Sequence, residues 1–237
     1  MMDGITILEL LIKELKGKSI SEKLHYLSVN FPGKVVFTTS FGYEDQVITD
    51  MIFNEDADLE VVTLDTGRMF EETYKVFRST VEKYGKNIRV FFPPAEKVEK
   101  LMTEKGPFSF YESVENRKEC CFIRKVIPLK RALEGKIVWI TGLRADQSVN
   151  RSTLEEFEWD EINRIVKFNP LYNWDLEKVK KYVKENHVPY NVLHDKGFVS
   201  IGCEPCTRAV RPDEDFRAGR WWWEQNSGKE CGLHETK

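Results

Sequence analysis

Four short apolar runs alternate with amphipathic segments between residues 34 and 142, and this alternation limits the folds that the chain can adopt. The runs are KVVFTTSFG (34–42), LEVVTLDTG (59–67), NIRVFF (87–92) and KIVWITG (136–142). The segments that separate them, 44–53, 71–85, 95–106 and 124–135, have the apolar spacing of helices. Alternating strands and helices predict an α/β fold, a doubly wound and mostly parallel sheet with helices on both faces.

The remainder of the chain adds few regular elements. Residues 1–27 form an amphipathic helical pattern, 157–170 resemble two short strands about a turn, and 175–187 predict a helix capped by Asp175. From residue 188 the periodicity fades into a tail rich in Gly, Cys, Arg and Trp, which we interpret as a functional lid. We therefore expect an α/β domain over 1–187 and a C-terminal segment over 188–237 that does not fold independently.

Charge and composition exclude several classes of protein. Lys+Arg number 36 and Asp+Glu 39, a net charge of -3, so no global basic field attracts nucleic acid. The N-terminal pattern lacks both a basic region with a cleavage site and a long apolar run. These features predict a soluble, cytoplasmic protein that binds neither nucleic acid nor membrane. The odd number of cysteines, 5, argues against a disulfide framework.

Three loops follow predicted strands and lead toward helix N-termini, where ligands bind in open α/β sheets. They are TTSFGYED (38–45), LDTGR (64–68) and TGLRADQS (141–148). Their glycines permit close backbone approach or positive φ, and their arginines suit phosphate or sulfate, although a single arginine is more often a solvated surface charge. The candidate substrate-binding residues in these loops are Ser40, Gly42, Asp65, Thr66, Gly67, Arg68 and Arg144.

Four of the five cysteines occur as two pairs. Cys120 and Cys121 are adjacent in KECCFIRK, Cys203 and Cys206 form a CxxC in GCEPCTR, and Cys231 lies near the end. A disulfide between neighbours would be strained, and a CxxC alone is compatible with a redox dithiol, a zinc knuckle or chance. Adjacent ligands aim poorly at one ion but can reach two irons of a cubane, so we favour one 4Fe-4S cluster over zinc. Buried thiols that pack as small hydrophobes are the alternative, but charged neighbours argue against it.

The ordered set of motifs resembles the family of assimilatory adenylyl-sulfate and phosphoadenylyl-sulfate reductases. It runs from SFGYED through LDTGR, ECCFIRK, TGLRADQS, GCEPCTR and EDFRAGRWWWE to ECGLH. The resemblance implies an adenine nucleotide alpha-hydrolase-like fold and an enzyme that uses adenosine 5′-phosphosulfate in sulfate assimilation and cysteine biosynthesis. It assigns the cluster to the CC and CxxC pairs. The SGGxDS loop of adenylating relatives is SFGYED here, so ATP hydrolysis is not expected.

The resemblance also implies roles for residues outside the loops. Cys231 attacks the sulfur of the phosphosulfate, which expels AMP and leaves an S-sulfocysteine, and thioredoxin or glutaredoxin then releases sulfite. His234 and Lys125 complete the catalytic set: His234 supports the thiolate, and Lys125 lies between cluster and sulfate. Arg217 and Arg220 join Arg144 as cations that bind the substrate. A homo-oligomer is expected, and we interpret WWW (221–223) as an anchor for the tail.

Three alternatives compete with this prediction. A phosphoadenylyl-sulfate reductase or an enzyme that uses both substrates would require tolerance of a 3′-phosphate. A tRNA-thiolating or adenylating relative with an iron–sulfur site would need ATP and a basic RNA-binding face, which the charge disfavours. A non-catalytic metal-binding module would be insensitive to mutation of Cys231.

Overall fold

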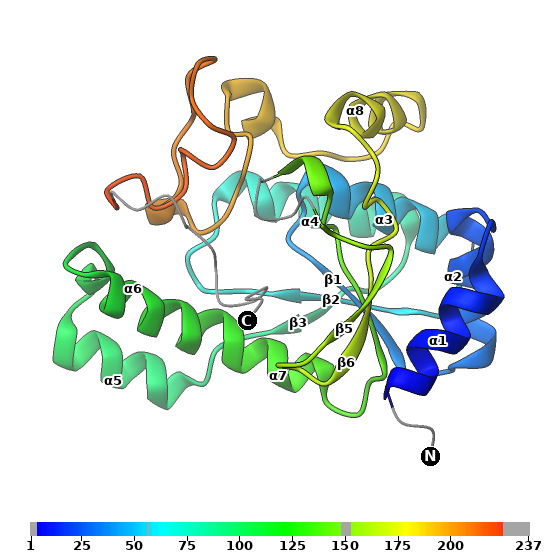
Figure 1. Cartoon of the computed structure of the whole chain (residues 1–237). Coiled ribbons are helices and arrows are strands. Elements are labelled where there is room, and N and C mark those ends of the chain that lie inside the picture. Colours follow the sequence, from blue (N-terminus) through cyan, green and yellow to red (C-terminus); the bar gives the residue numbers. More distant parts are fainter. Residues whose placement is uncertain (1–3, 56, 148–152, 225–237) are drawn as a thin grey trace. The chain divides into compact units, whose positions relative to one another are not determined.

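The computed structural model describes residues 4–55, 57–147 and 153–224, and its elements are labelled in Figure 1. The strands are β1 (Val35–Thr39), β2 (Glu60–Leu64), β3 (Arg89–Phe91), β4 (Val138–Ile140), β5 (Phe157–Asp160) and β6 (Ile165–Phe168). The α-helices are α1 (Gly4–Leu15), α2 (Ile20–Asn30), α3 (Tyr43–Asn54), α4 (Glu71–Tyr84), α5 (Ala95–Lys105), α6 (Val114–Cys121), α7 (Ile127–Leu133) and α8 (Leu176–Glu185). Short helical turns are η1 (Ser109–Tyr111), η3 (Ala145–Gln147), η5 (Val192–Lys196) and η6 (Glu204–Cys206), and η2 (Phe122–Val126) is a π-helix.

The six strands form one sheet in the order β3-β2-β1-β4-β6-β5. β1 pairs in parallel with β2 and with β4, β4 pairs in parallel with β6, and β5 pairs antiparallel with β6. The predicted α/β fold and mostly parallel sheet are therefore confirmed, as is the predicted hairpin. The chain order reverses at β1, so the loops that follow β1 and β4 leave the same edge of the sheet side by side.

The contacts divide the chain into two compact units, and each is built from separate stretches of sequence. Unit 1 comprises residues 1–63, 75–89 and 133–191, and unit 2 comprises residues 64–74, 90–132 and 192–237. The expected division into 1–187 and 188–237 stays a prediction.

Unit 1 contains the larger hydrophobic core. Val35 and Phe37 of β1 and Val138 and Ile140 of β4 are buried in it, as expected for strands covered on both faces. α3 contacts α8, and α1 contacts β5 and β6 (Figure 1). None of the described helices is both long and apolar enough to cross a membrane.

The N-terminal helical pattern is divided into two helices rather than one. Gly17, with φ of 75°, lies between α1 and α2 in the left-handed region that favours glycine. Ser19 then begins α2 with a capping box, because its side chain accepts from the Glu22 N–H and the Glu22 carboxylate accepts from the Ser19 N–H. Amphipathic periodicity alone does not reveal this interruption.

Unit 2 has a separate and smaller apolar cluster. Its buried members are Leu101, Phe110, Cys120, Ile123, Cys206 and Trp221. Ser113 caps α6 by accepting from the Asn116 N–H at 3.1 Å, and α6 contacts η1 and the π-helix. Two of the predicted metal ligands are thus part of the packing of this unit.

Candidate functional site

The loop after β1, in unit 1, is closed on itself by a carboxylate. The backbone N–H and the hydroxyl of Ser40 donate to Asp45 Oδ2 at 2.6 and 2.7 Å. Positive φ occurs at Phe41 (61°) and not at Gly42, which caps α3 with φ of -71°. The Phe41 ring is buried and stacks on Phe77 with centroids 5.0 Å apart, which fixes this uncommon conformation. Ser40 itself is exposed at the start of the loop.

Asp45 lies inside the SFGYED motif but was not among the predicted site residues. Burial raises its pKa to about 6, although the hydrogen bonds from Ser40 act in the opposite direction. A Cβ at Gly142 would lie 2.1 Å from Asp45 Oδ1, so the loop after β4 needs glycine to approach this carboxylate. The available signal in the sequence was the acidic residue at the end of the motif. A buried carboxylate at a helix N-terminus lowers stability unless other groups compensate its burial.

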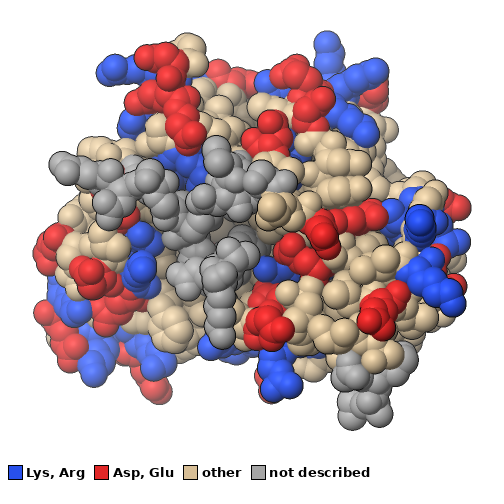
Figure 2. Space-filling view, viewed as in Figure 1, with Lys and Arg blue, Asp and Glu red and all other residues tan. Residues whose placement is uncertain are grey.

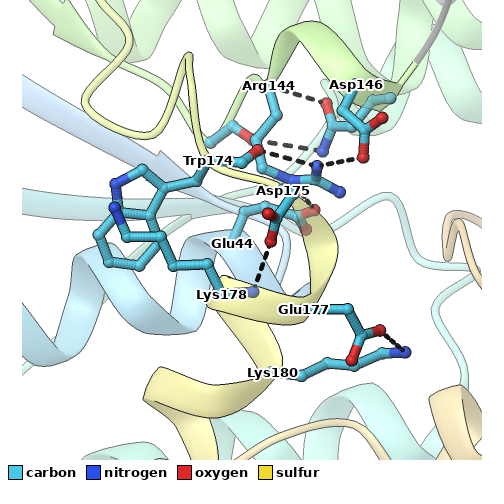
Figure 3. Close-up of polar contacts among 10 residues, drawn as sticks. Glu44, Arg144, Asp146, Trp174, Asp175, Glu177, Lys178 and Lys180 are labelled. Carbon is cyan, nitrogen blue, oxygen red and sulfur yellow. Dashed lines mark hydrogen bonds and ion pairs between the residues drawn. The ribbon is translucent and has the colours of Figure 1, made fainter.

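Arg144 is enclosed by acidic partners in unit 1, as Figure 3 shows. Its Nε donates to Glu44 Oε1 at 2.8 Å, and its Nη1 donates to Asp146 Oδ2 at 3.1 Å and to the Trp174 carbonyl at 3.2 Å. The residue is 0% exposed. These contacts make Arg144 a link between α3 and the loop after β4, and its role in substrate binding stays a prediction.

The loop 65–68, in unit 2, is ordered by Asp65. Its carboxylate accepts from the Gly67 N–H at 2.8 Å and from the Tyr74 hydroxyl at 3.0 and 3.1 Å. Burial, and then this carboxylate, raises the pKa of Tyr74 to about 12. Gly67 has φ of 70°, as its place in the motif predicts. The loop therefore depends on both Asp65 and Gly67 for its conformation.

The same loop contacts the elements that carry the cysteines. The Thr66 carbonyl accepts from Arg124 Nη1 at 2.6 Å, and the Thr66 hydroxyl lies 3.3 Å from Cys203 Sγ. Arg68 donates from Nη2 to the Pro107 carbonyl at 2.6 Å, and its guanidinium lies 5.0 Å from the centre of the Phe110 ring. Thr66 and Arg68 are thus held beside the cysteines.

One pocket of unit 2 brings the four paired cysteines together. It is lined by Arg68, Phe110, Arg117, Cys120, Cys121, Arg124, Lys125, Cys203 and Cys206. All four cysteines are unbridged. The pairs lie more than 80 residues apart in sequence, so the pocket exists only in the folded unit. We call it the cysteine pocket.

The electrostatics of the cysteine pocket are set by buried sulfur and surrounding cations. Burial, followed by the charge of Cys203, raises the pKa of Cys206 to about 12, while Lys125 and Arg220 act to lower it. Burial also raises the pKa of Cys120, against the influence of Arg124. Thiolates at these positions are costly unless a bound cation compensates them.

The residues of the pocket fit a sulfur-rich anionic group held by thiolates. Arg124, which lines the pocket, has a buried Nε–H with no hydrogen-bond partner. Outside the pocket lining, the described part of unit 2 has further buried N–H groups without a partner at Arg220 Nε, Trp221 Nε1 and Trp223 Nε1. No group of three or more His, Cys, Asp or Glu side chains among the described residues is arranged to hold a single metal ion. The four sulfurs share one pocket, and the group that they would hold stays a prediction.

Of the remaining predicted residues, three lie within the described ranges and two lie outside them. Lys125 is half-buried on the π-helix and lines the cysteine pocket. Arg220 is buried and Arg217 half-buried, with their guanidinium groups 4.8 and 5.9 Å from the Trp221 ring centre. Trp221 is 1% exposed, which agrees with an anchoring role. Cys231 and His234 lie outside the described residues.

Comparison with known proteins places these features in a family context. Residues 34–209 match the model of the phosphoadenosine phosphosulfate reductase domain. A protein of Agrobacterium fabrum named adenosine 5′-phosphosulfate reductase is 47% identical over 220 residues, which is 93% of this chain and 84% of that protein. A protein of Burkholderia cepacia with the same name is 49% identical over 203 residues, which is 86% of this chain and 81% of that protein.

Solved structures give the same fold. The phosphoadenylyl-sulfate (PAPS) reductase from Candida auris, in a phosphate complex, has a TM-score of 0.72 and 34% identity and covers 86% of this chain and 96% of its own. A Candida glabrata FMN adenylyltransferase with FAD and pyrophosphate has a TM-score of 0.53 and 13% identity, covering 99% of this chain and 85% of its own, a likeness of fold alone.

Proposed function

The chain belongs to the phosphoadenosine phosphosulfate reductase domain family, and we propose that it reduces adenosine 5′-phosphosulfate to sulfite and AMP. The observation that carries this proposal is the identity of 43–49% to curated proteins named adenosine 5′-phosphosulfate reductase, over most of both chains. Sulfate assimilation and cysteine biosynthesis are the corresponding cellular role, and we expect a cytoplasmic location. The protein is thus an oxidoreductase that acts on a sulfur group.

We propose that a 4Fe-4S cluster binds in the cysteine pocket through Cys120, Cys121, Cys203 and Cys206. The support is the shared pocket, its cationic lining and the buried Arg124 Nε–H, which has no hydrogen-bond partner. Such a cluster would supply a fixed local charge beside the anionic substrate and would tie α6 to the CxxC segment. Anaerobically purified protein should contain iron and acid-labile sulfide in equal amounts. Colourless protein with stoichiometric zinc would contradict this assignment.

The proposed reaction is a transfer of the sulfonate to Cys231. The thiolate of Cys231 forms a bond to the substrate sulfur, the bond between that sulfur and the phosphate oxygen breaks, and AMP leaves. His234 supports the thiolate, while Lys125, Arg217 and Arg220 stabilise the anionic groups. A dithiol of thioredoxin or glutaredoxin then attacks Cys231 Sγ, which releases sulfite and ends as a disulfide. This second protein supplies the two electrons.

Nucleic acid is not part of the proposal. The net charge is -3, and basic and acidic side chains are interspersed on the face drawn in Figure 2. A homo-oligomer remains an expectation that analytical ultracentrifugation tests directly.

Sulfite release with each nucleotide is the decisive assay. With reduced thioredoxin, the protein should form sulfite from adenosine 5′-phosphosulfate, and Cys231→Ser should form none while it still binds AMP. The likeness to the Candida auris enzyme makes the 3′-phosphorylated nucleotide the necessary second substrate. Sulfite from that nucleotide alone would overturn the proposed specificity, and sulfite from Cys231→Ser would overturn the mechanism.

A further inference from the structure

A buried ion pair in unit 2 joins α6, which carries Cys120 and Cys121 and is called the cysteine helix below, to Glu224, the last residue of the described range 153–224. Arg117 Nε donates to Glu224 Oε1 at 2.8 Å, and Arg117 Nη2 donates to Glu224 Oε2 at 2.9 Å. The two side chains are 4% and 5% exposed. The pair is therefore bidentate, a geometry that fixes the orientation of the two side chains as well as the distance between them. Other contacts of Arg117 add to this pair.

Arg117 is placed by α6 beside the proposed cluster ligands. It precedes Cys120 by three residues, so both side chains lie on one face of the helix, and both line the cysteine pocket. The guanidinium also lies 4.6 Å from the centre of the Trp221 ring. Arg117 consequently contacts two residues of the segment 221–224 from a fixed position on the helix.

The segment 221–224 is also attached to the CxxC through its backbone. The Trp221 N–H donates to the Cys206 carbonyl at 3.1 Å, and the Glu224 N–H donates to the Trp221 carbonyl at 2.9 Å. Trp221 has φ of 43°, an uncommon conformation for a bulky residue that packing must enforce. Segment 221–224 is thus attached both to the CxxC, through Cys206, and to α6, through Arg117.

Global stability alone is a weak reason for this arrangement. Replacement of a buried ion pair by apolar residues often leaves stability unchanged or improves it, whereas the pair specifies geometry. The geometry specified here is the position of Glu224 relative to α6. Cys231 lies seven residues beyond Glu224, so a fixed Glu224 confines the Cα atom of Cys231 to within about 25 Å of the Glu224 Cα atom.

We propose that Arg117 and Glu224 are positioning residues, which anchor segment 221–224 to the cysteine helix and thereby set the origin of the segment that carries Cys231. The anchor follows from the described contacts, and its consequence for Cys231 rests on the proposed function.

Hydrogen exchange tests the anchor without reference to any activity. In Glu224→Gln and Arg117→Lys, the amides of Trp221 and Glu224 should exchange about tenfold faster, while those of β1 and β4 keep their wild-type rates. Glu119→Gln is the matched control, because Glu119 lies on the same helix and pairs with Lys105 at 40–42% exposure. Unchanged exchange at 221–224, or a rise throughout the chain, would overturn the proposal.

The rate of adduct formation on Cys231 tests whether the anchor positions the segment that carries this residue. In single-turnover mass spectrometry with adenosine 5′-phosphosulfate and no thioredoxin, each variant should form the S-sulfocysteine about tenfold more slowly, with iron content and AMP affinity retained. The double variant should be no slower than the slower single variant, because both substitutions remove one contact. Wild-type rates, or rates that fall only in step with iron content, would overturn this role. A wild type that forms no adduct would refute the proposed function, while the exchange result would still decide the anchor.

Discussion

At the scale of single residues, Asp45 stabilises a loop through hydrogen bonds, but burial of its carboxylate costs free energy of folding. Its carboxylate holds the Ser40 backbone and hydroxyl at the start of α3, yet it is buried at 8% exposure. Because burial raises its pKa from 3.8 to about 6, the folded protein binds more protons than the unfolded chain between these pH values. Stability from this group therefore falls as pH rises through that window, by at most about 3 kcal/mol.

Asp45→Asn should remove this pH dependence. Its side-chain oxygen still accepts from Ser40, so the variant should resemble wild type near pH 4 and become more stable near pH 7.5, by up to about 3 kcal/mol. Urea unfolding at both pH values measures the difference, and subtraction of wild type cancels other titrating groups. Glu82→Gln, at an exposed pair with Arg78, is the control. An equal loss of stability at both pH values would contradict the argument.

The sequence allowed the conformation of some loop residues to be predicted, but not that of others or the partners of distant side chains. Gly67 has one of the two features that its motif allows, a positive φ, while its role in substrate binding stays a prediction. The left-handed residue of the first loop is Phe41 rather than Gly42, since a buried stack on Phe77 overrides the local preference for glycine. The partners of Arg144 include Glu44, 100 residues away, and such distant pairing leaves no periodic signal in one sequence.

At the scale of elements, the π-helix relates the cysteine pair to the cations that follow it. Residues 122–126 contain the wider turn between α6 and α7. A π-turn commonly corresponds to one residue inserted into an α-helix, and it turns the side chains that follow. Arg124 is thereby placed to donate to the Thr66 carbonyl at 2.6 Å. Single-sequence periodicity does not distinguish such a turn, so this element was not predicted.

Deletion of Phe122 should restore a regular helix and break this arrangement. Arg124 and Lys125 would rotate by about 100° relative to Cys120. We expect loss of the buried bond to Thr66, a cost of about 1–3 kcal/mol, and lower iron content and nucleotide affinity. Iron analysis and AMP titration measure both effects.

The control for this deletion is Phe122→Ala, which keeps the length of the turn. Phe122 is 47% exposed, so the substitution should change stability by only about 0.5 kcal/mol. A deletion variant that keeps iron and binds AMP like wild type would show that the π-turn has no positioning role.

At the scale of the whole molecule, the sequence predicted the layers of the fold, while the expected division into 1–187 and 188–237 stays a prediction. The alternation of strands and helices is a local pattern that repeats along the chain, so the parallel sheet followed from it. The hairpin at 157–168 followed from a separate local pattern, two short strands about a turn. Unit 2 combines 64–74, 90–132 and 192–237, and this grouping arises from packing between distant segments. The cysteine pairs indicated only that two of these segments meet.

The separation of the two hydrophobic cores leads to a prediction about removal of the proposed cluster. Cys120 and Cys206 belong to the small core of unit 2, whereas the core of unit 1 contains no cysteine in its described residues. Anaerobic chelation of iron should therefore raise hydrogen exchange in α6 and at 203–207, because the folding energy of a ligand site is lost with its metal. The amides of β1, β4 and β6 should keep their protection, since their packing lies within unit 1. Exchange that rises equally in both units would show that the cluster supports the whole fold, and exchange that does not change would show that these thiols hold no structural metal.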